Sequence, residues 1–176
     1  MDREGNKAVV ARFDELANSG GDLALLDTLC TPDLVNHALA EGRPQGLEGT
    51  REFLRNARRE THGGRWISSV VVAEGDMVVQ FGVRELHWPG GSFMGFEVPA
   101  GTATRDVAFA YRLVDGRIAE RWAIRDDLSM LRQLGVVGRR SDPDRGAPNP
   151  ATEASGTPCH AGTDLGAPPS CRSPRG

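Results

Sequence analysis

The stretch RDVAFAYRLVDGRIAERWAIR, residues 105–125, decides the fold because it holds two strand-like segments separated by a turn. In its second half apolar and charged residues alternate, as at Trp122 and Ile124, which is the period of a half-buried β-strand. The Asp-Gly pair at 115–116 is the strongest short hairpin signal in the sequence. We therefore predict an antiparallel hairpin built from residues 105–114 and 117–125.

Further strand and helix patterns lie upstream and downstream of this hairpin. Two valine-rich segments, 66–73 and 77–87, are joined by the short connection EGD, which predicts a second hairpin. Helical apolar spacing predicts four helices, at 6–18, directly after Asp22, at 48–60 and at 127–134. Asp22 can cap the second of these helices. Helices followed by a run of strands indicate an α+β fold rather than a parallel α/β sheet. We expect a curved antiparallel sheet around the first helices, with a pocket on its concave face.

The domain organisation follows from length and composition. A chain of 176 residues has room for one domain and a tail. Residues 139–176 contain seven of the eleven prolines, and Leu165 is their only large aliphatic residue. Such a segment cannot bury enough apolar surface to offset its ordering entropy. We predict one domain over residues 1–138 and a disordered Pro/Gly-rich tail over residues 139–176.

Net charge, apolar runs and the spacing of cysteines and histidines indicate which partners, compartment and metal sites to expect. The formal net charge of -3 offers no global attraction to nucleic acid or to an anionic membrane, so we expect neither. The chain has no apolar run of membrane-spanning length and no signal-peptide core, which predicts a soluble, cytoplasmic protein. Cys30 is expected to be a buried core thiol. No Cys-x-x-Cys or His-x-x-x-His spacing argues for a metal site, and we expect neither a metal nor a cofactor.

Five segments, taken together in their order, resemble the SnoaL-like polyketide cyclases. They are LVNHA at 34–38, GLEGTREFL at 46–54, FMGFEVPAGTATRD at 93–106, YRLVDGRIAERW at 111–122 and DDLSMLRQLG at 126–135. The resemblance covers about residues 7–137. It implies the cone-shaped α+β barrel of nuclear transport factor 2, with three N-terminal helices packed on a curved antiparallel sheet and a short C-terminal helix. It also implies a homodimer formed through the sheet.

The resemblance implies a cofactor-free intramolecular aldol condensation in which an aspartate acts as acid and base. Carried over to this sequence, that aspartate falls on Ala123, and its supporting histidine falls on Phe109 of the preceding strand. The catalytic pair is therefore missing. Asn36 does match a pocket asparagine of the family, and Asp126 matches a second acidic position, so acid-base chemistry here has to use another group.

Asp126 and His37 are the candidate catalytic residues. Asp126 or its neighbour Asp127 is a candidate general base in a partly apolar pocket containing Trp122 and Phe109. The alternative is that one of the two carboxylates is simply the N-cap of the last helix. His37 follows Asn36, and a neutral imidazole can move protons at cellular pH or hydrogen-bond a substrate. Its alternative role is to satisfy neighbouring backbone groups.

The candidate substrate-binding residues share one face of the sheet or line the mouth of the pocket. Strand alternation puts the side chains of Arg105, Phe109 and Tyr111 on one face. Arg121 and Ala123 share the corresponding face of the next strand, and an arginine there can stabilise an enolate or bind a carboxylate. Edge ion pairs are the alternative for these arginines. The full set is Asn36, Trp122, Phe109, Tyr111, Arg105, Arg121 and Phe93, with Phe93 as a gate for an apolar ligand or as part of the core.

The predicted function is a small-molecule enzyme of secondary metabolism, such as antibiotic biosynthesis. It would cyclise or isomerise a polyketide-like, apolar carbonyl substrate by acid-base catalysis, as a lyase or isomerase. Because position 123 carries no acid, hydroxylation or ether- or epoxide-type cyclisation on the same fold is an alternative. A non-catalytic ligand-binding dimer module is a third, since one fold hosts many functions.

Overall fold

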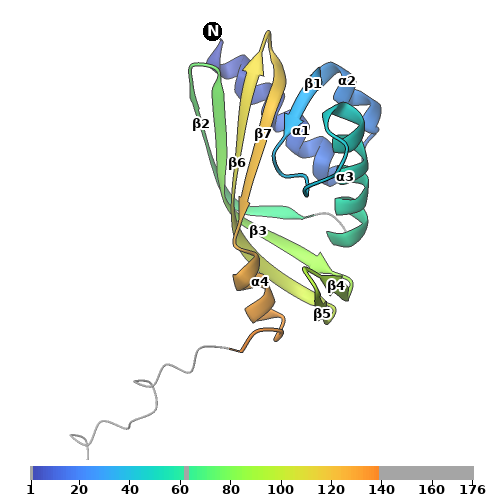
Figure 1. Ribbon diagram of the computed structural model, residues 1–176. Helices are drawn as coiled ribbons and strands as arrows, with labels where there is room; N and C mark the ends of the chain where they lie inside the picture. Colours follow the sequence, from blue (N-terminus) through green and yellow to red (C-terminus); the bar gives the residue numbers. More distant parts are fainter. Residues whose placement is uncertain (1, 62–63, 139–176) are drawn as a thin grey trace, which may run out of the picture. The chain divides into compact units, whose positions relative to one another are not determined.

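The computed structural model describes residues 2–61 and 64–138. The predicted disorder of residues 139–176 falls outside these residues. Within the described part, the fold is α+β, with a curved mixed sheet and helices (Figure 1).

A five-stranded sheet, in the order β1-β7-β6-β3-β2, is the central element. Its strands are β1 Cys30–Asn36, β2 Arg65–Glu74, β3 Met77–Trp88, β6 Gly101–Val114 and β7 Arg117–Arg125. Both predicted hairpins are confirmed: Glu74 pairs with Met77, and Val114 pairs with Arg117. In the second turn Asp115 has φ 49° and Gly116 has φ 74°, as a type I′ turn requires.

One edge of the sheet differs from the prediction. The sheet was expected to be antiparallel throughout, but β1 pairs with β7 in parallel, with Cys30 opposite Ile118. Cys30 is buried as predicted, at the first position of this strand rather than within a helix. The leucines before Cys30 have helical spacing, so the sequence pattern gave no indication that a strand begins at Cys30. Pro32 fits because an edge strand tolerates a residue without an N–H.

The helices pack on one face of the sheet and build the core. They are α1 Arg3–Ser19, the 3-10 turn η1 Leu23–Leu25, α2 Leu26–Leu29, α3 Gly46–Thr61 and α4 Asp127–Gln133. Val10 and Phe13 of α1 are buried against the sheet because they lie one helical turn apart. The ring of Phe13 meets that of Tyr111 edge-on, with centroids 5.7 Å apart. As predicted, Asp22 caps the short helical segment, since its carboxylate accepts from the Ala24 N–H at 2.9 Å.

A small hairpin extends from the far end of the sheet. Its strands are β4 Gly91–Phe93 and β5 Phe96–Val98. Met94 and Gly95 turn the chain between them, both with positive φ, at 51° and 83°. A second apolar cluster forms beneath this hairpin from Leu86, Trp88, Val98, Ala103, Met130 and Leu131. No helix within the described residues has the length and apolar character needed to cross a bilayer.

Candidate functional site

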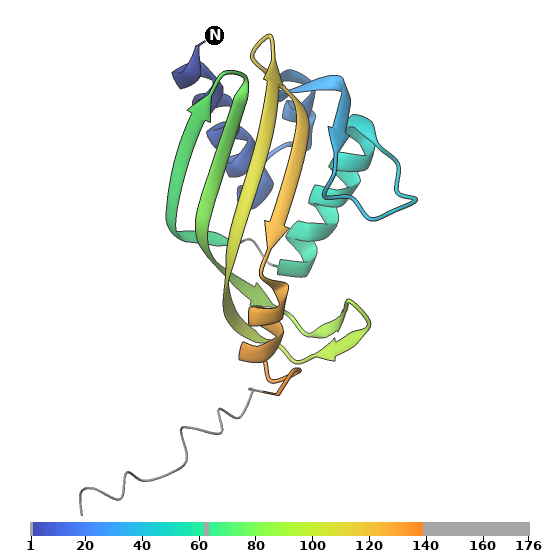
Figure 2. The same cartoon turned by 60° about the vertical axis from the view of Figure 1, so that its left-hand side comes forward.

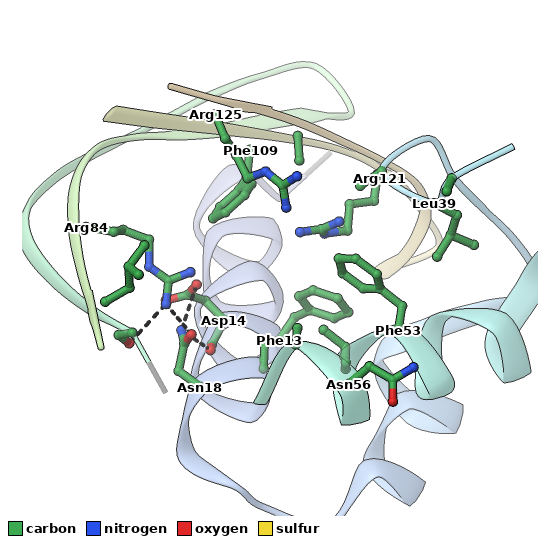
Figure 3. A pocket seen from close by; sticks show the side chains of 18 of the residues that line it. Phe13, Asp14, Asn18, Leu39, Phe53, Asn56, Arg84, Phe109, Arg121 and Arg125 are labelled. Atoms are coloured by element: carbon green, nitrogen blue, oxygen red, sulfur yellow. Dashed lines mark hydrogen bonds between the residues drawn. The ribbon is translucent and has the colours of Figure 1, made fainter. Parts of the chain in front are cut away.

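A cavity of about 340 Å³ lies between the sheet and the helices α1 and α3 (Figure 3). This volume is in the range of small-molecule sites. The helices contribute Phe13, Asp14, Asn18, Phe53 and Asn56 to its wall, and the strands contribute Arg84, Arg105, Phe109, Tyr111, Arg121, Ala123 and Arg125. The lining therefore combines several aromatic rings with several guanidinium groups.

Strand alternation explains which sheet residues reach the cavity. Phe109 of β6 is the register partner of Ala123 of β7, and Tyr111 is the partner of Arg121. All four line the cavity because residues two apart on a strand point to the same face. This shared face agrees with the parity argument made from the sequence.

Arg121 is the most enclosed cation of the cavity, with only 6% of its surface exposed. Its guanidinium carbon lies 5.9, 5.7 and 5.1 Å from the ring centroids of Phe13, Phe53 and Phe109. Its Nη1 donates to the Asn36 Oδ1 at 3.2 Å, and its buried Nε has no hydrogen-bond partner. Among the described residues, no carboxylate forms an ion pair with it. The guanidinium is thus held by neutral groups alone.

Asn36 positions Arg121 from behind. It is fully buried and is not part of the cavity wall. Its Nδ2 donates to the Thr50 Oγ1 at 3.2 Å, and its Oδ1 also accepts from the Ala38 N–H at 3.1 Å. These bonds fix the amide orientation that presents Oδ1 to the guanidinium. Asn36 was predicted to bind substrate, but it lies behind Arg121 and instead holds that side chain in position.

A second polar cluster lies on the other side of Phe109, where β2 and β3 meet α1. The Asp14 Oδ2 accepts from the Trp66 Nε1 at 2.7 Å, and its Oδ1 accepts from the Asn18 Nδ2 at 3.1 Å. Arg84 donates to the Asn18 Oδ1 and, at 2.9 Å, to the Gly64 carbonyl (Figure 3). Burial lowers the pKa of Arg84, and the nearby charge of Asp14 opposes that effect.

Arg105 and Arg125 share one carboxylate at the end of the cavity. Arg105 Nη1 is bonded to Asp127 Oδ1, and Arg125 Nη2 lies 3.2 Å from Asp127 Oδ2. Burial lowers the pKa of Arg105, and Asp127 offsets part of that effect. For Arg105, the alternative of an ion pair therefore holds, and its partner is Asp127.

Comparison with known proteins adds the family. The family model of the SnoaL-like polyketide cyclases matches residues 7–134. The chain belongs to the SnoaL-like polyketide cyclase family. Among curated proteins, none matches it.

Solved structures agree with this SnoaL-like assignment. IdmH from Streptomyces antibioticus, a candidate polyketide cyclase, is 30% identical, with a TM-score of 0.62 over 74% of this chain and 99% of that one. TsrD from Streptomyces laurentii is 22% identical, with a TM-score of 0.65 over 78% and 99%. AclR from Streptomyces galilaeus, a candidate hydroxylase, is 19% identical, with a TM-score of 0.61 over 78% and 89%. The last two show the shared fold alone.

This SnoaL-like chain places Asp126 and His37 outside the cavity. The Asp126 Oδ1 accepts from the Ser129 N–H at 2.9 Å, so the exposed carboxylate caps α4. The exposed His37 ring stacks on Trp122, with centroids 4.8 Å apart, and its Nε2 lies 3.2 Å from the Glu120 Oε2. The two side chains therefore do not open into one common cavity. Their catalytic roles stay predictions that the cavity does not support.

Trp122 also lies outside the cavity, on the face of β7 that points away from it. It falls between Arg121 and Ala123, whose side chains face the cavity, so alternation turns its ring away from the cavity. The prediction that placed Trp122 beside Phe109 in one pocket overlooked this alternation. The ring instead contacts His37, and it has the Arg112 guanidinium carbon 6.0 Å from its centroid.

The remaining predicted residues, Phe93 and Tyr111, do line the SnoaL-like cavity. Phe93 packs edge-on against Trp88, with centroids 5.4 Å apart, so it also belongs to the second apolar cluster. Burial raises the pKa of Tyr111, and the charge of Arg121 opposes this shift. Within residues 2–61 and 64–138, no group of three or more His, Cys, Asp or Glu side chains could hold a metal ion.

Sequence reasoning missed Asp14, Asn18 and Arg84. Asp14 and Asn18 are four residues apart on α1, and each follows an apolar residue of the face that points to the sheet. This spacing at the border of an apolar stripe is the signal that was present. Arg84 shares the inward parity of Leu86 on β3, which marks it in the same way.

Proposed function

We propose that this SnoaL-like chain is a small-molecule enzyme of secondary metabolism that cyclises or isomerises a polyketide-like carbonyl compound by proton transfer, without a cofactor. The observation that carries the proposal is the position of Asp14 and Arg84 at one side of an aromatic cavity, where both side chains are hydrogen-bonded to Asn18. A carboxylate can remove a proton, and a buried guanidinium can stabilise the oxyanion that results.

The proposed reaction starts at a carbon next to a carbonyl group. Asp14 takes a proton from that carbon, and the electron pair of the broken C–H bond moves onto the carbonyl oxygen, beside Arg84. In the isomerisation of an unsaturated ketone, the enolate is a conjugated dienolate, and Asp14 returns the proton to its γ-carbon as the double bond moves into conjugation and the carbonyl re-forms. In a cyclisation, the enolate carbon forms a bond to a second carbonyl carbon, and the oxygen of that carbonyl takes the proton from Asp14.

Asp14 is preferred over the other acidic residues of the cavity because it is not neutralised by an ion pair. Glu52 lies 3.6 Å from the Arg43 Nη1, and Glu85 lies 2.8 Å from the Arg65 Nε. Among the described residues, Asp14 forms no ion pair, although both of its oxygens accept hydrogen bonds. Asp14 thus replaces Asp126 and His37 as the proposed acid-base residue.

Four predicted residues keep their proposed role in substrate binding. Phe109 and Tyr111 offer a flat apolar wall, and Phe93 lies where the β4–β5 hairpin meets the cavity. Arg105 is proposed to bind substrate only through the guanidinium edge that Asp127 leaves free.

Exchange of the α-protons of 2-tetralone in D2O, followed by proton NMR, tests the proposed base. This small aromatic ketone fits the proposed chemistry, and exchange needs only the first step. Asp14→Asn keeps the size of the side chain and is expected to slow exchange by roughly 100-fold. Asp126→Asn is the matched control and is expected to retain the wild-type rate. Unchanged exchange in Asp14→Asn, or its loss in Asp126→Asn, would contradict the assignment.

The hydroxylation or ether- or epoxide-type alternative rests on the absence of an acid at position 123. Unlike the proposed proton transfer, hydroxylation needs an oxidant, and the epoxide-type cyclisation needs a substrate that carries an epoxide. The exchange test separates the alternatives, because neither a hydroxylation component nor a binding module without a base accelerates α-proton exchange. A wild-type protein that binds 2-tetralone without exchanging it would favour these alternatives.

We also propose that the protein is a homodimer formed through the outer face of the sheet, meaning the face away from α1 and α3 (Figure 2). Its support is two rows of mostly apolar side chains that cross four strands in register. The rows are Val70, Phe81, Ala108 and Ile124, and then Val72, Val79, Ala110 and Trp122. Ile124 is 74% exposed, and such contiguous apolar surface is typical of interaction sites.

A further inference from the structure

The SnoaL-like cavity contains more positive charge than its own carboxylates neutralise. Arg84 and Arg121 form no ion pair with any carboxylate of the described residues, and Arg105 and Arg125 share the single carboxylate of Asp127. The Nε atoms of Arg84, Arg105 and Arg121 are buried without a hydrogen-bond partner. Buried charges in proteins are normally paired, because an unpaired one loses its hydration without compensation. This imbalance points to an anionic ligand.

The environment of Arg121 keeps its charge available. An amide oxygen from Asn36 holds one end of the guanidinium, where a carboxylate would have cancelled the charge. Three aromatic rings surround the guanidinium at 5.1 to 5.9 Å. Cation–π contacts of this kind offset only part of the cost of burying the ion. The Asn36 network also fixes the guanidinium before a ligand arrives, so little ordering remains to be done on binding.

One small molecule can reach both cationic groups. The guanidinium carbons of Arg84 and Arg121 lie 5.9 and 5.1 Å from the centroid of the same Phe109 ring. Figure 3 shows the two side chains approaching this ring from different sides, with Asp14 beside Arg84 only. The two arginines therefore differ in their surroundings: Arg84 lies next to the proposed base, and Arg121 lies in an aromatic enclosure without an acid.

We infer that the substrate is an aromatic or polycyclic keto acid whose carboxylate binds Arg121 and whose reacting carbonyl lies beside Arg84 and Asp14. The flat body of the molecule stacks against Phe109, between the two groups. A carboxylate and a guanidinium form a strong charge-assisted pair, and the apolar walls exclude the water that would weaken it. The inference rests on the proposed function, because it names the substrate class of the same cavity.

Titration calorimetry with 2-naphthoate and with 2-naphthamide tests the inference without any turnover. The two probes share the ring system and differ in charge. We expect the wild-type protein to bind the carboxylate at least about 10-fold more tightly than the amide, and added salt to reduce the difference. Arg121→Met is expected to abolish the preference. Arg112→Met is the matched control, because Arg112 lies on the outer face and pairs with Glu120 at 3.4 Å.

Ala123→Asp is the second variant, in case Arg121→Met does not fold. It retains the arginine and adds a carboxylate on the same face of β7, which is expected to neutralise Arg121 and remove the preference. Equal wild-type affinities for the two probes would overturn the inference, as would a preference that survives both substitutions. The result is independent of the 2-tetralone experiment, since that ketone is uncharged. A carboxylate preference without exchange would retain this inference and remove the proposed reaction.

Discussion

Phe109 and Ala123 face each other across β6 and β7, and both side chains line the cavity. The SnoaL-like resemblance places a histidine and a catalytic aspartate at these same two positions. This chain has a phenyl ring and a methyl group there, so neither position offers Arg121 an acidic partner. The sheet wall of the cavity therefore presents the Arg121 guanidinium and carries no acid at these two positions.

Ala123→Asp is expected to stabilise the protein at neutral pH, by an amount on the order of 1 kcal/mol, because the new carboxylate can pair with Arg121. Pairing lowers the pKa of the carboxyl group in the folded state. The gain is therefore present above the carboxyl group's ordinary pKa and is lost as the pH falls through the lowered value. Thermal unfolding at pH 7 and pH 3 measures both effects. An equal shift in an Arg121→Met background would show that the pair does not form.

Asp126→Ala is expected to destabilise the protein by roughly 0.5–2 kcal/mol, because the α4 N–H of Ser129 loses its cap. Asp126→Asn retains a capping oxygen and is expected to stay close to wild type. Urea unfolding of the three proteins measures the difference. A large loss of stability in Asp126→Asn would indicate a role for the charge beyond capping.

Cys30 makes stability depend on pH in the alkaline range. Burial raises the pKa of its thiol to about 12, so the folded protein keeps the proton that the unfolded chain loses at lower pH. Stability from this group is complete below the ordinary thiol pKa and is lost as the pH rises toward the folded value. Between pH 8 and pH 10, wild type is expected to lose about 1 kcal/mol more than Cys30→Ala in urea unfolding. Parallel losses in the two proteins would refute this assignment.

Ile124→Asp is expected to convert the proposed dimer into a monomer, because it places a charge at the β7 end of the apolar rows, at their most exposed residue. Sedimentation velocity over a range of concentrations measures the state of association. Leu25→Asp is the matched control, since Leu25 is also an exposed apolar residue but belongs to η1. A monomeric wild type, or a dimer that survives Ile124→Asp, would contradict the outer-face interface.

Local signals in the sequence predicted most of the fold. The Asp115-Gly116 turn, the EGD turn and the cap at Asp22 all depend on residues close in sequence, and the structure confirms them. The parallel pairing of Cys30 with Ile118 has no local signal, because it joins distant parts of the chain. The leucines before Cys30 satisfied a helical period, and that period obscured the strand.

The candidate site was only partly predictable for a related reason. Strand parity correctly placed Phe109 and Arg121 on one face, since alternation is a local property. The same rule, applied consistently, would have put Trp122 on the other face. Asp14 lies on a helix, so strand alternation does not apply to it. A carboxylate that borders the apolar stripe of a helix can equally well face solvent, and its spacing alone therefore did not identify it. Only the packing of α1 under β2 and β3 brings it toward Arg84.

The parallel pairing of β1 with β7 also has a consequence for synthesis on the ribosome. Cys30 is translated long before Ile118, so the edge strand has no partner until β7 leaves the exit tunnel. At about 5–20 residues per second, this wait lasts for several seconds. During that interval the leucines of α2 and β1 lack the strands that later bury them. The nascent chain therefore exposes these leucines during synthesis, at a stage when exposed apolar surface favours aggregation.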